Sequence, residues 1–171
     1  MVRLAHLADH PEVITSLAQW LHGEWGHLPD ASLEKRVAQL EAQAQRGTLP
    51  CAFVAFDDSE LVGSASLVPN DMHSHPELTP WLAAVYVVPS ARGRGIGSAL
   101  SLRVAQETMA LGHAQLYLFT PSQQRLYARL GWREFATELY NTRQVSVMVC
   151  DLPPNPSLQR TTQAHSRLCG R

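Results

Sequence analysis

The segment at residues 88–100 (VPSARGRGIGSAL) constrains the fold more than any other part of this chain, because it places three glycines between two regular elements. The preceding run at 81–88 (WLAAVYVV) is continuously apolar, which is typical of a strand buried on both faces. After the glycines, apolar residues recur four apart, which predicts a helix over about 96–111. A buried strand that turns directly into a helix requires a sheet with helices packed against it.

The same turn has the properties of an anion-binding site. Glycines let backbone N–H groups approach an anion closely. The N-terminus of the following helix adds unpaired donors and the positive end of its dipole. Arg92 and Arg94 add positive charge. Together these features suit a pyrophosphate.

Three known anion-binding patterns compete for this turn. A P-loop needs Gly-Lys-Ser/Thr, and the chain's only lysine is Lys35. A dinucleotide fingerprint needs GxGxxG, which Gly93 and Gly95 begin but Ser98 breaks. The third pattern, R/Q-x-x-G-x-G/A, fits the residues from Arg92 to Gly97.

The rest of the chain predicts an α/β fold with a mixed sheet and helices on both faces. The predicted strands cover 2–7, 51–56, 61–68, 81–88, 114–119, 132–136 and 143–150. The predicted helices begin at Asp9, near Asp30, at about 96 and at a Thr120–Gln123 capping box, and the second and fourth end at Gly47 and Gly131. The order β-α-α-β-β-β-α-β-α-β-β is not a run of βαβ repeats.

The third pattern resembles the acetyl-CoA signature of the GNAT N-acetyltransferase family, and the element order matches that family over roughly residues 1–150. The resemblance implies an acyl-CoA N-acyltransferase fold with a central, mostly antiparallel sheet. We expect one such domain at 1–151. Residues 152–171 contain three prolines and no apolar period, which predicts a tail with little fixed structure.

The resemblance also implies acetyl-CoA as the acetyl donor. In the family, main-chain amides of the signature loop hold the pyrophosphate, and the pantetheine arm enters between the preceding strand and the next one. The cofactor-binding residues implied here are Val85, Tyr86, Val87, Arg92, Gly93, Arg94, Gly95, Ile96, Gly97 and Ser98. A backbone N–H of the strand would donate to the thioester carbonyl, as in an oxyanion hole.

Catalytic roles follow from position in the family pattern. The segment 126–132 (LYARLGW) matches the family's tyrosine helix, so the resemblance implies that Tyr127 protonates the departing thiolate. A half-buried tyrosine that only packs on the sheet is the alternative. Our candidates for the base that takes the amine proton are Glu24 and Asp71. His73 is a third residue of a suitable type. For each of the three, the alternative is an ordinary surface residue without a catalytic role. A chain of water molecules can then remove the proton without a dedicated base.

The charge distribution bears on the acceptor. Residues 1–91 carry four basic and eleven acidic side chains, and residues 92–133 carry six basic and one acidic. This suits an anionic donor and a small cationic amine as acceptor, although solvated surfaces would give the same counts. A protein N-terminal or lysine acetyltransferase and a non-catalytic acyl-CoA sensor are the alternatives. The overall charge of −1 argues against a nucleic-acid partner.

Composition excludes several other classes. No apolar run reaches the ~20 residues that a membrane span needs, and the first residues lack the features of a secretory signal, so we expect a cytoplasmic protein without a membrane partner. Three cysteines without a CxxC motif indicate neither a disulfide framework nor a zinc site, and we expect no bound metal. The family resemblance leaves a homodimer as an option.

Overall fold

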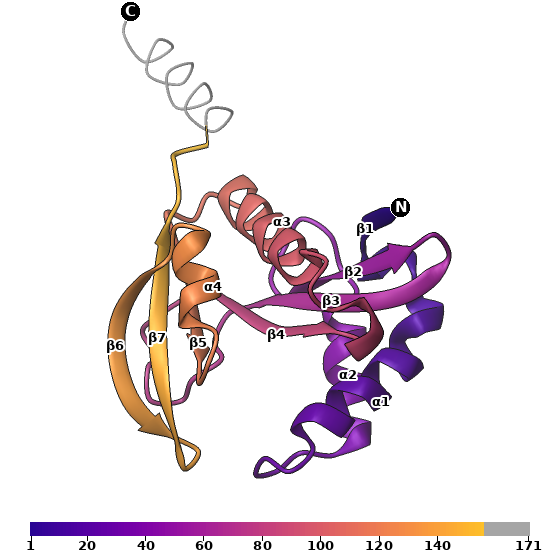
Figure 1. Ribbon diagram of the computed structural model, residues 1–171, viewed down its shortest axis with the longest axis horizontal. Helices are drawn as coiled ribbons and strands as arrows, with labels where there is room; N and C mark the ends of the chain where they lie inside the picture. The colour runs from indigo at the N-terminus through magenta and orange to yellow at the C-terminus, as the bar shows by residue number, and fades with distance from the viewer. Residues whose placement is uncertain (156–171) are drawn as a thin grey trace, which may run out of the picture.

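A computed structural model describes residues 1–155 of the protein (Figure 1). The greater part of the predicted tail, from residue 156 onward, lies outside the described residues. The strands are β1 (Val2–His6), β2 (Cys51–Asp57), β3 (Glu60–Val68), β4 (Trp81–Val87), β5 (Gln115–Thr120), β6 (Arg133–Tyr140) and β7 (Arg143–Asp151). The α-helices are α1 (Ile14–Trp25), α2 (Leu33–Gln43), α3 (Ile96–Ala110) and α4 (Gln124–Arg129). The predicted order of elements is confirmed.

The strands form a single mixed sheet in the order β1-β2-β3-β4-β5-β7-β6. All neighbours are antiparallel except β4 and β5. Helices α1 and α2 cover one face of its first half, while α3 lies on the other face (Figure 1). The predicted fold class is therefore confirmed.

The start of α1 was predicted wrongly. Asp9 does not cap the helix, because two 3-10 turns follow β1 and α1 begins only at Ile14. Pro11 opens the second of these turns, and the Asp9 carboxylate instead accepts from Arg46, with one bond of 3.1 Å from Nε. A carboxylate engaged in this ion pair is no longer available to cap the helix.

Two other helices also have boundaries that differ from the predicted ones. Ser32 caps α2 by accepting from the Lys35 backbone N–H at 3.1 Å, and α2 ends at Gln43 rather than at Gly47. The Thr120 hydroxyl accepts from the Gln123 N–H at 3.0 Å, as in a capping box, but it closes a turn and α4 starts afterwards.

A bulge in β4 separates this strand from β5. Ser66 pairs with Ala83 and Ser64 pairs with Tyr86, so two residues of β4 face one residue of β3. Ala84 at this point has a φ of 50°, which is a left-handed conformation unusual for a residue other than glycine. Bulges bend a strand and can end its pairing. Accordingly, β4 and β5 pair only at Trp81 and Tyr117, and the last residues of β4 have no partner on that side.

Candidate active site

The glycine turn has the geometry that the sequence suggests. Gly93 and Gly95 have φ values of 75° and 77°, which L-residues with a side chain rarely adopt. Gly95 is the N-cap of α3, so the first N–H groups of this helix have no acceptor within the helix. An anion at this point would find several main-chain donors and the positive end of the α3 dipole.

Both arginines of the turn already contact other groups of the protein. Arg92 Nε donates to the Val87 carbonyl at 2.9 Å, and its guanidinium lies 5.8 Å from the centre of the Tyr86 ring. Arg94 forms a 2.7 Å ion pair with Asp57, which helps hold the pKa of that carboxyl below its usual value. Main-chain amides would therefore be the donors least committed to other contacts if an anion binds this turn.

The end of β4 lies directly beside the turn. A Cβ built on Gly97 would meet the side chains of Val87 and Val85 at 3.8 and 3.9 Å, so the first turn of α3 packs on this strand. Because β5 has diverged there, the segment from Val85 to Val87 has no strand partner on its β5 side, although it still pairs with β3 on the other side. The structure thus brings together the predicted loop and the predicted strand residues, while their contact with a ligand stays a prediction.

Tyr127 lies at the inner side of α4 and is 7% exposed. Its ring meets Trp132 edge-on at 5.8 Å, within the core formed with α3. Burial raises the pKa of this phenol, and a hydrogen bond with Ser101 acts in the opposite direction. Tyr127 is therefore a neutral hydroxyl at physiological pH, which is the form that an acid requires.

Ser101 makes a contact with the proposed acid that sequence reasoning missed. This buried side chain lies one turn into α3 and donates to the Gly97 carbonyl at 2.8 Å, so it links the phenol of Tyr127 to the glycine turn. A serine inside a predicted helix carries no signal of such a contact.

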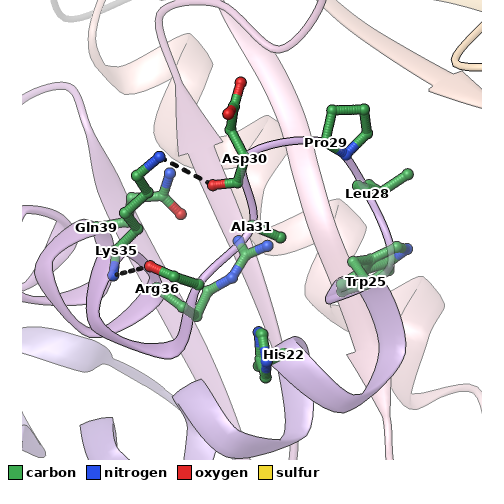
Figure 2. A pocket seen from close by; sticks show the side chains of 10 residues that line it. His22, Trp25, Leu28, Pro29, Asp30, Ala31, Lys35, Arg36 and Gln39 are labelled. Atoms are coloured by element: carbon green, nitrogen blue, oxygen red, sulfur yellow. Dashed lines mark hydrogen bonds between the residues drawn. The ribbon is translucent and has the colours of Figure 1, made fainter.

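A pocket of about 330 Å³ opens between the end of α1 and the start of α2 (Figure 2). Its lining residues are His22, Trp25, Leu28, Pro29, Asp30, Ala31, Ser32, Lys35, Arg36 and Gln39. Trp25 also meets the Tyr86 ring of β4 edge-on, with 6.4 Å between the ring centres. One aromatic pair therefore connects this pocket with the strand beside the glycine turn.

Asp71 and Arg36 act on one another electrostatically next to this pocket. Burial raises the pKa of Asp71 to about 7, and the positive charge of Arg36 opposes this shift without overcoming it. Burial lowers the pKa of Arg36, and Asp71 opposes that change. A carboxyl with a pKa near neutrality exchanges protons readily at physiological pH, as a general base must.

Glu24 is more exposed than Asp71. It lies in the last turn of α1, and neither of the two carboxylates is among the residues that line the pocket. Within residues 1–155, no hydrogen bond or ion pair uses its carboxylate. The structure therefore gives no contact that joins the two predicted candidates, and the identity of the base stays a prediction.

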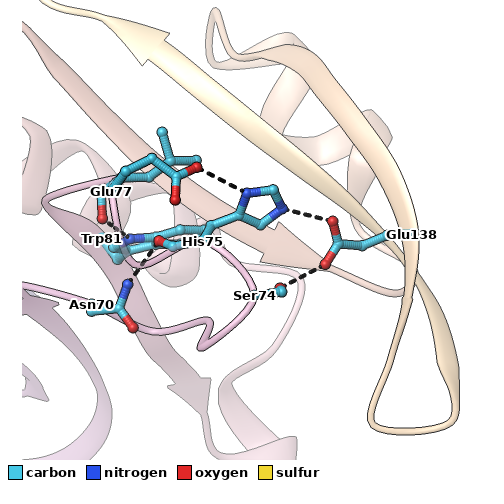
Figure 3. A network of polar contacts seen from close by, with 7 residues as sticks. Asn70, Ser74, His75, Glu77, Trp81 and Glu138 are labelled. Carbon is cyan, nitrogen blue, oxygen red and sulfur yellow. Dashed lines mark hydrogen bonds and ion pairs between the residues drawn. The ribbon is translucent and has the colours of Figure 1, made fainter.

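The loop that carries Asp71 is fastened to the β6 strand (Figure 3). His75 Nε2 lies 2.6 Å from a Glu138 oxygen, and the Ser74 hydroxyl donates to the other oxygen at 2.8 Å. Tyr140 and His73 form a second link, with 2.9 Å between the phenolic oxygen and Nδ1. We call the His75–Glu138 pair the loop clasp.

We expect the loop clasp to stabilise the protein in a defined pH range. Glu138 raises the pKa of His75, and His75 lowers that of Glu138. The ionic contribution is therefore complete below the unfolded histidine value of 6.5 and is lost as pH rises through the raised value. At the acidic end it disappears as Glu138 protonates. Glu138→Gln should therefore lower Tm more at pH 6 than at pH 8.5.

Thermal unfolding of Glu138→Gln at these two pH values, beside Glu77→Gln, tests the clasp. Glu77 is the more distant partner of His75, at 3.3 Å, and is the matched control that should have the smaller effect. Equal losses of Tm at both pH values would contradict an ionic clasp.

Among residues 1–155, no group of three or more His, Cys, Asp or Glu side chains is arranged to hold a metal ion. In the same range, no helix is long and apolar enough to cross a membrane. The expectation of a homodimer stays a prediction.

Comparisons with known proteins agree with this geometry. A family model described as an acetyltransferase (GNAT) domain matches residues 49–134. Mycothiol acetyltransferase of Rhodococcus jostii (strain RHA1) is 33% identical over 144 residues, which cover 79% of this chain and 46% of that protein. This chain thus spans about half the length of that relative.

Solved structures share the fold at lower identity. The putative acetyltransferase YncA of Salmonella typhimurium, determined with its cofactor acetyl-CoA, is 19% identical with a TM-score of 0.69, covering 91% of this chain and 95% of that one. An aminoglycoside 6'-N-acetyltransferase complexed with coenzyme A has the same identity and TM-score, with coverage of 90% and 99%.

Proposed function

Because this chain belongs to the GNAT acetyltransferase family, we propose that it is an enzyme that transfers the acetyl group of acetyl-CoA to a primary amine. One observation carries the proposal. The Arg92–Gly97 turn presents the N-terminus of α3 beside the end of β4 that has no partner on its β5 side. Free main-chain donors in this turn, next to a strand edge without a partner, suit a long anionic donor such as acetyl-CoA.

The donor would be held mainly by the backbone. Amides of residues 93–98 would bind its pyrophosphate, and the main chain of Val85, Tyr86 and Val87 would line its pantetheine arm. A β4 N–H aimed at the thioester carbonyl would stabilise the oxyanion that develops during attack. The Val87 carbonyl accepts from Arg92 in this structure, so that side chain would have to move if the arm used this acceptor.

Proton transfers complete the reaction. Asp71 would take a proton from the acceptor's ammonium group, and the free amine would attack the thioester carbon directly, without a covalent acyl-enzyme. As the C–N bond forms, the C–S bond breaks, and Tyr127 would protonate the thiolate that leaves. The nitrogen loses its second proton as it becomes an amide, and this proton would restore the phenol of Tyr127. The neutral phenol of Tyr127 and the near-neutral pKa of Asp71 suit these roles.

The acceptor remains the open part of the proposal. A small cationic amine fits the acidic composition of residues 1–91, and a protein amine is the main alternative. A pure acyl-CoA sensor is less well supported, because a sensor needs neither an acid at Tyr127 nor a base beside a pocket. Release of free thiol from acetyl-CoA that depends on an added amine would exclude the sensor.

Thermal unfolding with acetyl-CoA, ATP or NAD tests donor binding. Selective binding at 100 times Kd adds about 2.7 kcal/mol to the free energy of unfolding, so Tm should rise with acetyl-CoA alone. No rise at millimolar acetyl-CoA would refute the proposed function.

Two glycine variants make this test specific to the turn. Gly95 and Gly47 both have a left-handed φ, of 77° and 64°, and an added Cβ meets no atom within 4 Å at either. Gly95→Ala and Gly47→Ala should therefore lose similar stability, about 1–2 kcal/mol. Only Gly95→Ala should also reduce the rise of Tm with acetyl-CoA.

A further inference from the structure

The pocket between α1 and α2 presents more positive than negative charge. Lys35 and Arg36 line it together with His22, and Asp30 is the one acidic residue of the lining. Lys35 Nζ donates to the backbone carbonyl of Asp30 at 3.0 Å, and no ion pair joins their side chains within residues 1–155. These charges differ from the acidic average of the first half of the chain.

Arg36 lacks a fixed anionic partner. In the described part of the chain, no hydrogen bond or ion pair uses its guanidinium, although the side chain is partly buried. Figure 2 shows Arg36 and His22 extending toward the same space from neighbouring helices. A cation removed from water without a counter-ion is costly, and a bound anion would remove that cost. Asp71, which acts on it electrostatically, is only partly ionised near neutral pH.

The pocket also has contacts toward the proposed base and toward the proposed donor-binding strand. Trp25 forms one of its walls and meets Tyr86 of β4, and Arg36 lies within electrostatic reach of Asp71. A molecule anchored at Arg36 can therefore extend toward both the proposed base and the strand that would hold the thioester.

We propose that the acceptor is a small aminocarboxylate whose carboxylate binds Arg36 in this pocket while its amine is the group that becomes acetylated. The inference rests on the proposed function and replaces the simple cationic amine with a molecule that carries both charges. A guanidinium matches a carboxylate with two parallel hydrogen bonds, which gives orientation as well as affinity. A pocket of about 330 Å³ is in the range of small-molecule sites.

Matched pairs of amines test the proposal by thiol release from acetyl-CoA. Each pair differs only in the carboxylate: methionine and 3-(methylthio)propylamine, phenylalanine and phenethylamine, lysine and cadaverine. We expect at least one amino acid to exceed its partner at least tenfold in kcat/KM. Arg36→Gln should reduce that ratio at least tenfold through KM, and Arg36→Lys should reduce it less. Arg3→Gln, on the edge strand β1, removes an equal charge and should preserve the ratio.

The outcomes separate this inference from the proposed function. Preference for the amine without a carboxylate in every pair, an unchanged ratio in Arg36→Gln, or acetylation of acidic peptides alone would overturn the inference but leave the acetyltransferase standing. If acetyl-CoA raises Tm yet no amino acid is acetylated or stabilises the coenzyme A complex, the inference also fails. Absence of any acetyl-CoA effect on Tm would instead refute the proposed function itself.

Discussion

Tyr127→Phe should lower kcat by about a hundredfold or more while the affinity for acetyl-CoA changes little, because general acid catalysis typically contributes 10²–10⁴-fold. The substitution removes one oxygen and keeps the ring that packs against Trp132 in the core. The phenol's proton is needed only as the thiolate departs, so its loss should appear in the chemical step. Steady-state kinetics with a saturating amine, together with the Tm shift by acetyl-CoA, measure the two quantities separately.

Tyr117→Phe is the matched control for this experiment. Tyr117 is another buried tyrosine, 8% exposed, whose hydroxyl donates to Gln115 at 2.7 Å on β5. It should lose some stability without a comparable loss of kcat. If Tyr127→Phe retained full turnover, the acid role would be wrong, and the Tyr127–Ser101 contact would be only a packing feature.

The features that the sequence predicted well are those fixed by local chemistry. Gly93 and Gly95 are needed because the turn requires positive φ at these positions. The continuously apolar run at 81–88 is typical of a strand buried on both faces of a sheet. The order of strands and helices follows from such local patterns, and it identified the fold together with the resemblance of residues 92–97 to the family signature. Asp71, the proposed base, was named from its position in the chain, but its raised pKa depends on burial that a sequence does not display.

The features that were missed depend on contacts between distant segments. The β4 bulge centres on Ala84, where an alanine gives no sign of a left-handed conformation. Asp9 has the residue type of a helix cap, but the fold brings Arg46 to it and removes it from that role. The cationic pocket was hidden in the average charge of residues 1–91, because composition does not tell which side chains face one another.

Asp71→Asn should reduce kcat/KM by about a hundredfold or more and remove a titration near pH 7 from the activity profile. Asp71 acts as a base only when it is ionised, and burial raises its pKa to about 7. In the wild type, kcat/KM should therefore rise with pH up to about 7 and then level, apart from ionisation of the amine itself. Glu24→Gln, the other candidate base, should keep this titration. If this titration were lost in Glu24→Gln and kept in Asp71→Asn, Glu24 rather than Asp71 would be the base.

The same pKa makes an independent prediction for stability. A carboxyl that titrates at about 7 when folded and at 3.8 when unfolded holds more protons in the folded state between these values. The free energy of unfolding therefore falls as pH rises from about 4 to 7, because ionising the partly buried Asp71 costs more in the folded protein. Asp71→Asn cannot ionise, so its Tm relative to wild type should increase from pH 4 to pH 8. A variant that is less active yet more stable at pH 8 would indicate that this carboxyl is retained for chemistry rather than for folding. A Tm difference independent of pH would mean that Asp71 titrates normally and that the expected titration of activity near pH 7 does not come from this carboxyl.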